Sequence, residues 1–347
     1  MYRVGIIGCG KPWRSEGATG FGMSHQHAEG YKASPDARIV ALADISEENA
    51  RAFQERHGGD TIYTDYRAML EQERLDIVSI STWPHLHAPM VIACAEAGVR
   101  AVHCEKPMAL TYGDSLAMVE ICERNGVQLT FNHQRRFGAP FRAAKALLQE
   151  GAIGALERME ATCGNLYDWG THWFDMLLFF NDETPAEWVI GQVDLRGSQR
   201  VFGAPVEGHG LSHFRCRNGV HGVLMTGHGA YHPLLIRLVG SDGVIELGHN
   251  NEVPLRVWGR GQSGWQGVPL NEGLHGGECT RRGVLDLIAA LKEGREPELS
   301  GRRALRATEL IFATYESSRR RARVDLPLDV TDSPLQALLD EAGVTPV

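Results

Sequence analysis

The chain has 347 residues, of which 43% are hydrophobic and 22% are charged, and its formal net charge is −8. This length exceeds one ordinary hydrophobic core, because a domain holds roughly 150 residues, so two domains with a ligand pocket at their interface are expected. The negative charge argues against a nucleic-acid partner, which needs clustered cations, and no apolar tract is long enough to cross a membrane.

The first third of the chain alternates short apolar runs with amphipathic stretches, a pattern typical of βαβ units and a parallel sheet. Five apolar runs are expected as strands: Arg3 to Ile7, Ile39 to Ala43, Ile77 to Ser81, Ala101 to Cys104 and Gln128 to Phe131. Five amphipathic stretches are expected as helices: Met23 to Ala33, Glu47 to Arg56, Tyr66 to Gln72, Ala88 to Ala97 and Tyr112 to Arg124. This order predicts a doubly wound domain of the Rossmann type over residues 1–132. The first run also lacks the longer apolar segment of a secretory signal, which predicts a cytoplasmic protein.

The regular alternation of expected strands and helices ends after about Arg136. Helices are expected at Pro140 to Gln149 and Thr171 to Phe180, with a strand at Arg158 to Cys163 between them. Six further strands follow: Trp188 to Leu195, Leu211 to Arg217, Val220 to Thr226, Leu235 to Val239, Val244 to Leu247 and Leu255 to Trp258. Two long amphipathic helices, about Gly276 to Glu293 and Gly301 to Arg321, close the chain and are free to pack back on the first domain.

Residues 133–347 are therefore predicted to form an α+β domain with a mainly antiparallel open sheet, giving an α/β protein overall. We expect this domain to bind the substrate and to mediate oligomerisation. One face of its sheet is expected to be exposed, which predicts a homodimer or homotetramer.

Gly8-Cys9-Gly10 directly follows the first expected strand. Glycines at such a turn let backbone N–H groups approach a pyrophosphate at a helix N-terminus. The full G-x-G-x-x-G pattern requires a third glycine where this chain has Trp13, and a polar stretch from Lys11 to Gly22 precedes the helix instead. We interpret that stretch as an insertion that lengthens the phosphate loop; the alternative is an ordinary turn.

Asp44 ends the second expected strand, where a carboxylate can accept hydrogen bonds from the ribose hydroxyls of an adenosine. It is followed by Ile45 and Ser46 and then by Glu47 and Glu48, so a 2′-phosphate would meet negative charge and no arginine. The pattern favours NAD over NADP, with Asp44 and Ile45 joining the glycines as cofactor contacts.

Asp168 and His172 stand four residues apart at the start of an expected helix. At that spacing the carboxylate can orient the imidazole. The positive end of the helix dipole also favours the neutral imidazole that a general base needs near pH 7. The alternative is a helix-capping Asp168 beside a structural histidine.

Glu105-Lys106-Pro107 follows the fourth expected strand, at the carboxyl edge of the sheet where open α/β folds bind ligands. The alternative is a charged loop. Tyr167 and Trp169, just before the expected helix, can stack on a sugar ring.

The chain resembles the Gfo/Idh/MocA family, the relatives of glucose-fructose oxidoreductase and inositol dehydrogenase, over essentially its whole length. The segments that carry the resemblance are Gly8-Cys9-Gly10, Ser81-Thr82-Trp83-Pro84-His85-Leu86-His87, Glu105-Lys106-Pro107, Gln134-Arg135-Arg136-Phe137, Asp168 to His172 with Asp175, and Ala313-Thr314-Tyr315-Glu316-Ser317. Two features depart from the family pattern: the third glycine is missing, and Trp83 stands where proline is common. The resemblance also implies a cis peptide bond before Pro107.

The resemblance implies an NAD-dependent oxidoreductase that transfers hydride between nicotinamide and a secondary hydroxyl or carbonyl of a sugar, polyol or inositol. It implies that Lys106 and His172 contact the reacting hydroxyl and that Asp168 completes the constellation. His172 then takes the hydroxyl proton during oxidation, while Lys106 stabilises the developing negative charge. Further contacts are implied for the cofactor at Ser81, Thr82, His87, Glu105 and Lys106, and for the substrate at Arg136.

Two other functions stay open. A related glycosidase would use NAD for a transient oxidation and release a sugar without net NADH. A non-catalytic, ligand-sensing regulator would need no proton relay, so the presence of Lys106, Asp168 and His172 argues against it.

No metal site is expected. Five histidines are candidates for metal ligands, but their spacings suit strand faces and turns better than a compact ligand set: His209, His213, His221, His228 and His232. The seven scattered cysteines lack a Cys-x-x-Cys pair and are expected to be reduced core thiols.

Overall fold

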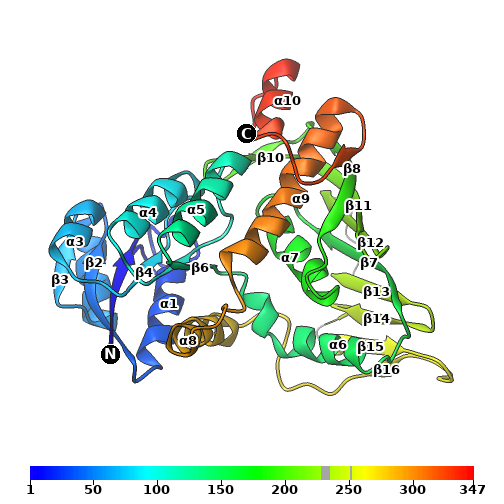
Figure 1. Cartoon of the computed structure of the whole chain (residues 1–347), viewed down its shortest axis with the longest axis horizontal. Helices are drawn as coiled ribbons and strands as arrows, with labels where there is room; N and C mark the ends of the chain where they lie inside the picture. Colours follow the sequence, from blue (N-terminus) through cyan, green and yellow to red (C-terminus); the bar gives the residue numbers. More distant parts are fainter. Residues whose placement is uncertain (228–234, 251) are drawn as a thin grey trace. The chain divides into compact units, whose positions relative to one another are not determined.

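The computed structural model describes residues 1–227, 235–250 and 252–347, which form two compact units (Figure 1). Unit 1 comprises Met1–Leu110, Asp114–Gln134 and Gly277–Leu305, and unit 2 comprises Thr111–Gly113, Arg135–Gly276 and Arg306–Val347. The C-terminal part of the chain therefore contributes to both units.

Unit 1 is built on a six-stranded parallel sheet in the order β3-β2-β1-β4-β5-β6. Its strands are β1 (Tyr2–Ile7), β2 (Ala37–Ala43), β3 (Thr61–Tyr63), β4 (Ile77–Ile80), β5 (Ala101–Cys104) and β6 (Gln128–Phe131). The predicted doubly wound sheet is confirmed. Only β3 was not predicted, because three residues are too few to show a periodicity. The strand order reverses between β1 and β4, and ligands of such sheets bind at the carboxyl ends beside this point.

Helices cover both faces of this sheet. They are α1 (Met23–Lys32), α2 (Glu47–His57), α3 (Tyr66–Gln72), α4 (Pro84–Glu96), α5 (Tyr112–Arg124), which belongs to unit 1 from Asp114 on, and α8 (Gly277–Glu293). Residues of β1 alternate between the faces: Val4 and Ile6 pack with α1, α2 and α8, whereas Ile7 packs on the side of α3, α4 and α5. Helix α8 lies beside α1 (Figure 1).

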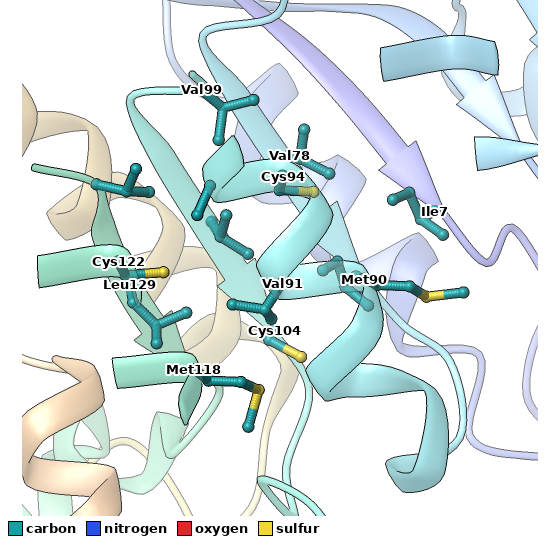
Figure 2. Packing of buried hydrophobic residues seen from close by; sticks show 14 of the residues in the cluster. Ile7, Val78, Met90, Val91, Cys94, Val99, Cys104, Met118, Cys122 and Leu129 are labelled. Atoms are coloured by element: carbon teal, nitrogen blue, oxygen red, sulfur yellow. The ribbon is translucent and has the colours of Figure 1, made fainter. Parts of the chain in front are cut away.

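The core on the α4 and α5 side is rich in sulfur (Figure 2). Cys94 of α4, Cys104 of β5 and Cys122 of α5 are buried there among Met90 and Met118. All three are free thiols, and burial raises their pKa, to about 12 for Cys122. They therefore stay protonated at neutral pH and pack as small apolar groups.

Unit 2 contains a nine-stranded sheet in the order β16-β15-β14-β13-β7-β12-β11-β8-β17. Its strands are β7 (Leu156–Cys163), β8 (Ala186–Asp194), β11 (His209–Cys216), β12 (His221–Gly227), β13 (Ile236–Gly240), β14 (Gly243–Leu247), β15 (Leu255–Trp258), β16 (Gln266–Gly267) and β17 (Val324–Asp325). Its strand pairs are antiparallel apart from β7 with β12. The predicted, mainly antiparallel sheet is thus confirmed.

Helices pack on one face of this sheet. The helical segments of unit 2 are the 3₁₀ turn η1 (Gln134–Phe137), α6 (Ala139–Gln149), α7 (Gly170–Phe180), α9 (Gly301–Arg320), which belongs to unit 2 from Arg306 on, and α10 (Pro334–Ala342). Helix α7 packs on β7 and β12. Helix α9 approaches β8 so closely that a Cβ on Gly191 would lie 2.6 Å from the Thr314 side chain. Thr314 Oγ1 also lies 2.8 Å from Ser212 Oγ of β11, which ties the helix to two strands.

The opposite face of the sheet stays open. Ile190 of β8, Leu211 of β11, Met225 of β12 and Trp258 of β15 are between 40% and 48% exposed. Leu211 pairs with Met225 in the β-ladder, and His213, two residues further along the same strand, pairs with Ile190. Ile190, Leu211 and Met225 therefore lie on three neighbouring strands, whereas Trp258 lies further along the sheet.

Most boundaries agree with the sequence prediction within a few residues. Helix α4 begins at Pro84 and not at Ala88, because proline suits the first turn of a helix and Trp83 is extended before it. The short strands β9 (Gln199–Val201), β10 (Ala204–Val206) and β16 were not predicted, nor was α10. Helix α10 does have sequence signals, since the Ser333 side chain caps it and Gly343 ends it in the left-handed region. Among the described helices, none has the length and apolar character needed to cross a bilayer.

Candidate active site

The residues directly after the strands of unit 1 gather the sequence-predicted cofactor contacts at one sheet edge. Gly8 follows β1, Asp44 follows β2, Ser81 follows β4 and Glu105 follows β5. Asn132, which was not predicted as a contact, follows β6. Since parallel strands end at the same edge, the fold brings these five positions together.

The glycines after β1 are required by the backbone. Gly8 has φ +84°, and a Cβ there would lie 2.5 Å from the Ser81 carbonyl oxygen. Gly10 has φ +54°, a Cβ there would meet nothing within 4 Å, and its N–H donates to Asp44 Oδ2 at 3.0 Å. The turn is therefore tight on the side of β4 and open at Gly10, as a loop that accommodates a pyrophosphate needs to be.

The insertion from Lys11 to Gly22 returns to its own starting point. Gly22 has φ +60°, and a Cβ there would lie 2.7 Å from the Lys11 carbonyl oxygen, so the loop closes tightly before α1 begins at Met23. Ser24 of α1 donates to the Cys9 carbonyl at 2.7 Å, which joins the helix start to the glycine turn. The loop presents the rings of Trp13 and Phe21, which are 54% and 45% exposed.

Asp44 is half-buried and both of its carboxylate oxygens accept backbone hydrogen bonds. Oδ2 accepts from Gly10, and Oδ1 accepts from Ser46 at 2.8 Å. Each oxygen keeps a second lone pair for a ligand hydroxyl. Ile45 beside it is 95% exposed.

Glu105 is a buried carboxylate that faces inward. Its Oε1 lies 2.9 Å from His27 Nε2 and 2.6 Å from Asn132 Nδ2, and its Oε2 accepts from the Lys106 backbone N–H at 3.2 Å. Burial raises the pKa of this carboxyl, but the hydrogen bonds from His27 and Asn132 and the charge of Lys106 bring it down to about 2. Because the ordinary value is 4.5, the ionised group stabilises the fold at neutral pH, and this contribution is lost as the pH falls from 4.5 towards 2. The Lys106–Pro107 peptide bond is cis, as the family resemblance implies.

His87 joins the loops after β4 and β5. Its ring is fully buried, with Nδ1 2.9 Å from the Pro107 carbonyl oxygen and Nε2 3.2 Å from the Thr82 carbonyl oxygen. Burial lowers the pKa of this imidazole, so it stays neutral at physiological pH and donates to one of the carbonyls. The His87 side chain thus connects the loop after β4 with the loop after β5.

The second group of predicted residues lies at the start of α7 in unit 2. Asn165 Oδ1 accepts from the Asp168 N–H at 2.6 Å and from the Trp169 N–H at 3.3 Å, so Asn165, and not Asp168, supports the turn before the helix. Asp168 and His172 are both buried, and His172 is the third residue of α7. The predicted place of His172 in the first helical turn is confirmed.

The two aromatic substrate candidates differ in exposure. Trp169 is 41% exposed, whereas the Tyr167 ring is buried and burial raises its pKa. The Arg135 guanidinium lies 6.0 Å from the Trp169 ring centroid and 4.5 Å from that of Trp173. Of the Tyr167 and Trp169 side chains, only that of Trp169 is exposed.

Arg136 requires a correction. Its side chain is fully buried, and its guanidinium donates to both carboxylate oxygens of Asp175 at 2.8 Å and to Glu183 Oε1 at 2.6 Å. These carboxylates raise the pKa of Arg136 against the effect of burial. We therefore assign Arg136 to the packing of η1 against α7 and not to substrate binding.

The Arg136→Met variant is expected to lose about 3–5 kcal/mol of stability, because it leaves two carboxylates without their buried partner. Urea denaturation followed by circular dichroism measures this loss. The control is Arg142→Met, an exposed position on α6, which should leave the transition midpoint in place. An unchanged midpoint for Arg136→Met would contradict the structural role.

Sequence reasoning missed two buried polar groups. His27 of α1 is described above, and Glu207, between β10 and β11, accepts from the Leu166 N–H at 2.7 Å, the Thr226 hydroxyl at 2.8 Å and the Tyr315 hydroxyl at 2.7 Å. Neither belongs to a motif. Only the fold shows that Glu207 supports the turn that carries Asp168.

No cluster of three or more histidine, cysteine, aspartate or glutamate side chains within the described ranges could hold a metal ion. His213 Nε2 lies 2.9 Å from His221 Nδ1, an imidazole pair on the open face of the sheet. His228 and His232 lie outside the described residues.

Comparison with known proteins gives matches over both units. Residues 2–133 match a family model described as an oxidoreductase family with an NAD-binding Rossmann fold, and residues 160–246 match a GFO/IDH/MocA C-terminal domain. A D-apiose dehydrogenase of Paraburkholderia graminis is 29% identical over 96% of this chain and 92% of its own length. An inositol 2-dehydrogenase of Rhizobium meliloti is 24% identical over 93% of this chain and 99% of its own length.

Solved structures share the fold. A levoglucosan dehydrogenase in complex with NADH and levoglucosan superimposes with a TM-score of 0.79 at 23% identity, covering 94% of this chain and 99% of that protein. An oxidoreductase of Agrobacterium radiobacter in complex with NAD⁺, L-tartaric acid and magnesium has a TM-score of 0.77 at 22% identity, covering 93% and 98%.

Proposed function

The chain belongs to the Gfo/Idh/MocA family of oxidoreductases, and on that basis we propose that it is an NAD-dependent dehydrogenase of a sugar, polyol or inositol. The substrate group is a secondary hydroxyl, or the carbonyl formed from it. The observation that carries the proposal is the family match of both units together with the retained set of Lys106, Asp168 and His172.

The sheet edge of unit 1 fits the cofactor. The positive φ of Gly8 and the open space at Gly10 leave room for a pyrophosphate beside the start of the loop. Asp44 retains acceptor positions for ribose hydroxyls, and the exposed Ile45 offers an apolar surface for the adenosine. NAD, when bound, supplies the acceptor or donor of hydride.

The side chains of the chain supply the proton transfer and the electrostatic stabilisation. His172 takes the proton of the substrate hydroxyl during oxidation and returns it during reduction. Asp168 orients this imidazole, and Lys106 stabilises the negative charge that develops on the same oxygen. Lys106 belongs to unit 1 and His172 belongs to unit 2.

Each of the two domains predicted from the sequence has its own task in this proposal. Residues 1–132 bind NAD, and residues 133–347 bind the substrate, with Trp169 stacking on the sugar ring, and mediate association. The seven free thiols suit a reducing compartment, so we place the enzyme in the cytoplasm.

A panel of polyols, inositols and aldoses with NAD, followed by the absorbance of NADH, tests the function. Net NADH formation with at least one of them is the expected result. Release of sugar from a glycoside without net NADH would support the related glycosidase. Binding of NAD and sugar with no turnover across the panel would indicate a ligand-sensing regulator.

The Asp44→Ala variant is expected to bind NAD about 10- to 100-fold more weakly, because hydrogen bonds to a charged group contribute about 1.5–3 kcal/mol. Its preference for NAD over NADP should fall as well, since the negative charge that repels a 2′-phosphate is gone. Fluorescence titrations with NADH and with NADPH measure the two dissociation constants. Asp36→Ala, at an exposed ion pair with Lys292, is the matched control. Unchanged NAD affinity in Asp44→Ala would contradict the ribose assignment.

The chain is expected to sediment as a dimer or tetramer at micromolar concentration, with two copies meeting through the open face around Ile190, Leu211 and Met225. The Leu211→Asp variant places a charge in the centre of this apolar patch and should sediment as a monomer. Glu120→Lys, at an exposed position on α5, should not change the sedimentation coefficient. A monomeric wild type would rule out the association.

A further inference from the structure

His27 is a fully buried imidazole at the carboxyl edge of the parallel sheet. Its Nε2 lies 2.9 Å from Glu105 Oε1, and its Nδ1 lies 2.9 Å from Ser79 Oγ and 3.3 Å from Ser81 Oγ. A single side chain of α1 therefore connects the ends of β4 and β5. A buried ring nitrogen without a hydrogen-bond partner would cost free energy, and both nitrogens of His27 have partners.

The Glu105 carboxylate holds the backbone of the proposed catalytic lysine. Its Oε2 accepts the Lys106 N–H, while its Oε1 is held by His27 and Asn132. Rotation of this carboxylate would break all three contacts. The backbone direction at Lys106 thus depends on a carboxylate that is held by His27 of α1 and by Asn132, the residue after β6.

We propose that His27 and Glu105 form a buried positioning pair, in which His27 fixes the Glu105 carboxylate, and Glu105 sets the backbone direction of Lys106 and places a negative charge beside it. This inference rests on the proposed dehydrogenase function, because it gives Lys106 its task. It moves Glu105 from the group of cofactor contacts to the support of the lysine.

Glu105 supplies a negative charge beside Lys106. The titratable groups that interact with Glu105 are His27 of α1, His87 of α4, His103 and Cys104 of β5, and Lys106 itself. Burial keeps His87 and His103 neutral and Cys104 protonated. Glu105 is therefore the negative charge of this cluster, and it is the direct chain neighbour of Lys106.

Hydrogen bonding determines the proton positions on His27. An ionised carboxylate can only accept, so Nε2 carries a hydrogen. Glutamine and asparagine imitate the two halves of this ring, because the amide nitrogen of glutamine reaches about as far as Nε2 and that of asparagine about as far as Nδ1. His27→Gln keeps a donor towards Glu105, whereas His27→Asn keeps only the contact towards Ser79.

The decisive comparison is between these two variants in the full-length enzyme with a polyol that the wild type oxidises. His27→Asn should lose on the order of 10²-fold in kcat, the cost of a misplaced catalytic group, while its Kd for NADH stays close to that of the wild type. His27→Gln should remain within about tenfold of the wild-type kcat, since it keeps the bond to Glu105. His103→Asn is the control for another buried imidazole, because it keeps the bond from Nδ1 to Thr130 and makes none to Glu105.

The pH profile of kcat gives a readout that simple loosening of the fold would not change. Glu105→Gln removes the negative charge beside Lys106, so the alkaline limb of the profile should move to lower pH by about one unit. Glu105→Asp keeps the charge and should keep the limb in place even where kcat falls. Circular dichroism shows whether His27→Asn folds. If it does not fold, the pH profiles of the two Glu105 variants still test the proposal.

Equal kcat values and pH profiles for His27→Asn, His27→Gln and the wild type would overturn the proposal, as would an unmoved alkaline limb in Glu105→Gln. These failures differ from failure of the proposed function. In the latter case the wild type itself would produce no NADH with any polyol or sugar.

Discussion

The His172→Ala variant is expected to lose about 10³-fold in kcat with any polyol that the wild type oxidises, because no other group is assigned to take the hydroxyl proton. Its Kd for NADH should stay unchanged, since the predicted cofactor contacts all lie in unit 1. Steady-state kinetics and NADH fluorescence titration measure the two quantities. His172 is the third residue of α7 and lies in the first helical turn.

Asp168→Asn is the companion of this variant. An amide keeps the size of the side chain but can present an N–H to the imidazole and select the wrong tautomer, so a loss of kcat with unchanged NADH binding is again expected. Ser212→Ala, whose hydroxyl ties β11 to α9, is a control for a buried polar group of unit 2 outside the proposed chemistry. Wild-type turnover in His172→Ala would remove this histidine from the mechanism.

The Lys106→Ala variant is expected to lose about 10²- to 10³-fold in kcat, the usual effect of removing one group that stabilises a developing oxyanion. The backbone N–H at position 106 remains available to Glu105, so the turn before the cis proline should persist. Lys106→Arg keeps the charge but changes its reach and geometry, and it should recover only part of the rate.

The double variant Lys106→Ala with His172→Ala tests whether the two side chains act on one oxygen. Residues that work as a unit are not additive, so the double variant should be little slower than the slower single variant. Losses that multiply would show that the lysine and the histidine act independently. Wild-type rates in Lys106→Ala would exclude its electrostatic role.

The positions of the candidate residues in the fold were predicted best where a residue directly follows a strand end or lies at a helix start. Gly8, Asp44 and Lys106 are of this kind, since a parallel sheet places its strand ends at one edge whatever the side chains do. Arg136 was misjudged because a motif gives the order of residues and not their burial, and Asp175 and Glu183 engage it only after folding. His27 and Glu207 escaped prediction for the same reason.

The sequence by itself determined the doubly wound sheet, the mainly antiparallel second sheet, most element boundaries and the family, because periodicity and glycine positions are local properties of the chain. Only the tertiary structure decided which polar groups form hydrogen bonds and ion pairs with one another in the protein interior. Contacts such as His27 with Glu105 and Tyr315 with Glu207 join residues 78 and 108 positions apart. Such pairings depend on how the elements pack, which no local pattern records.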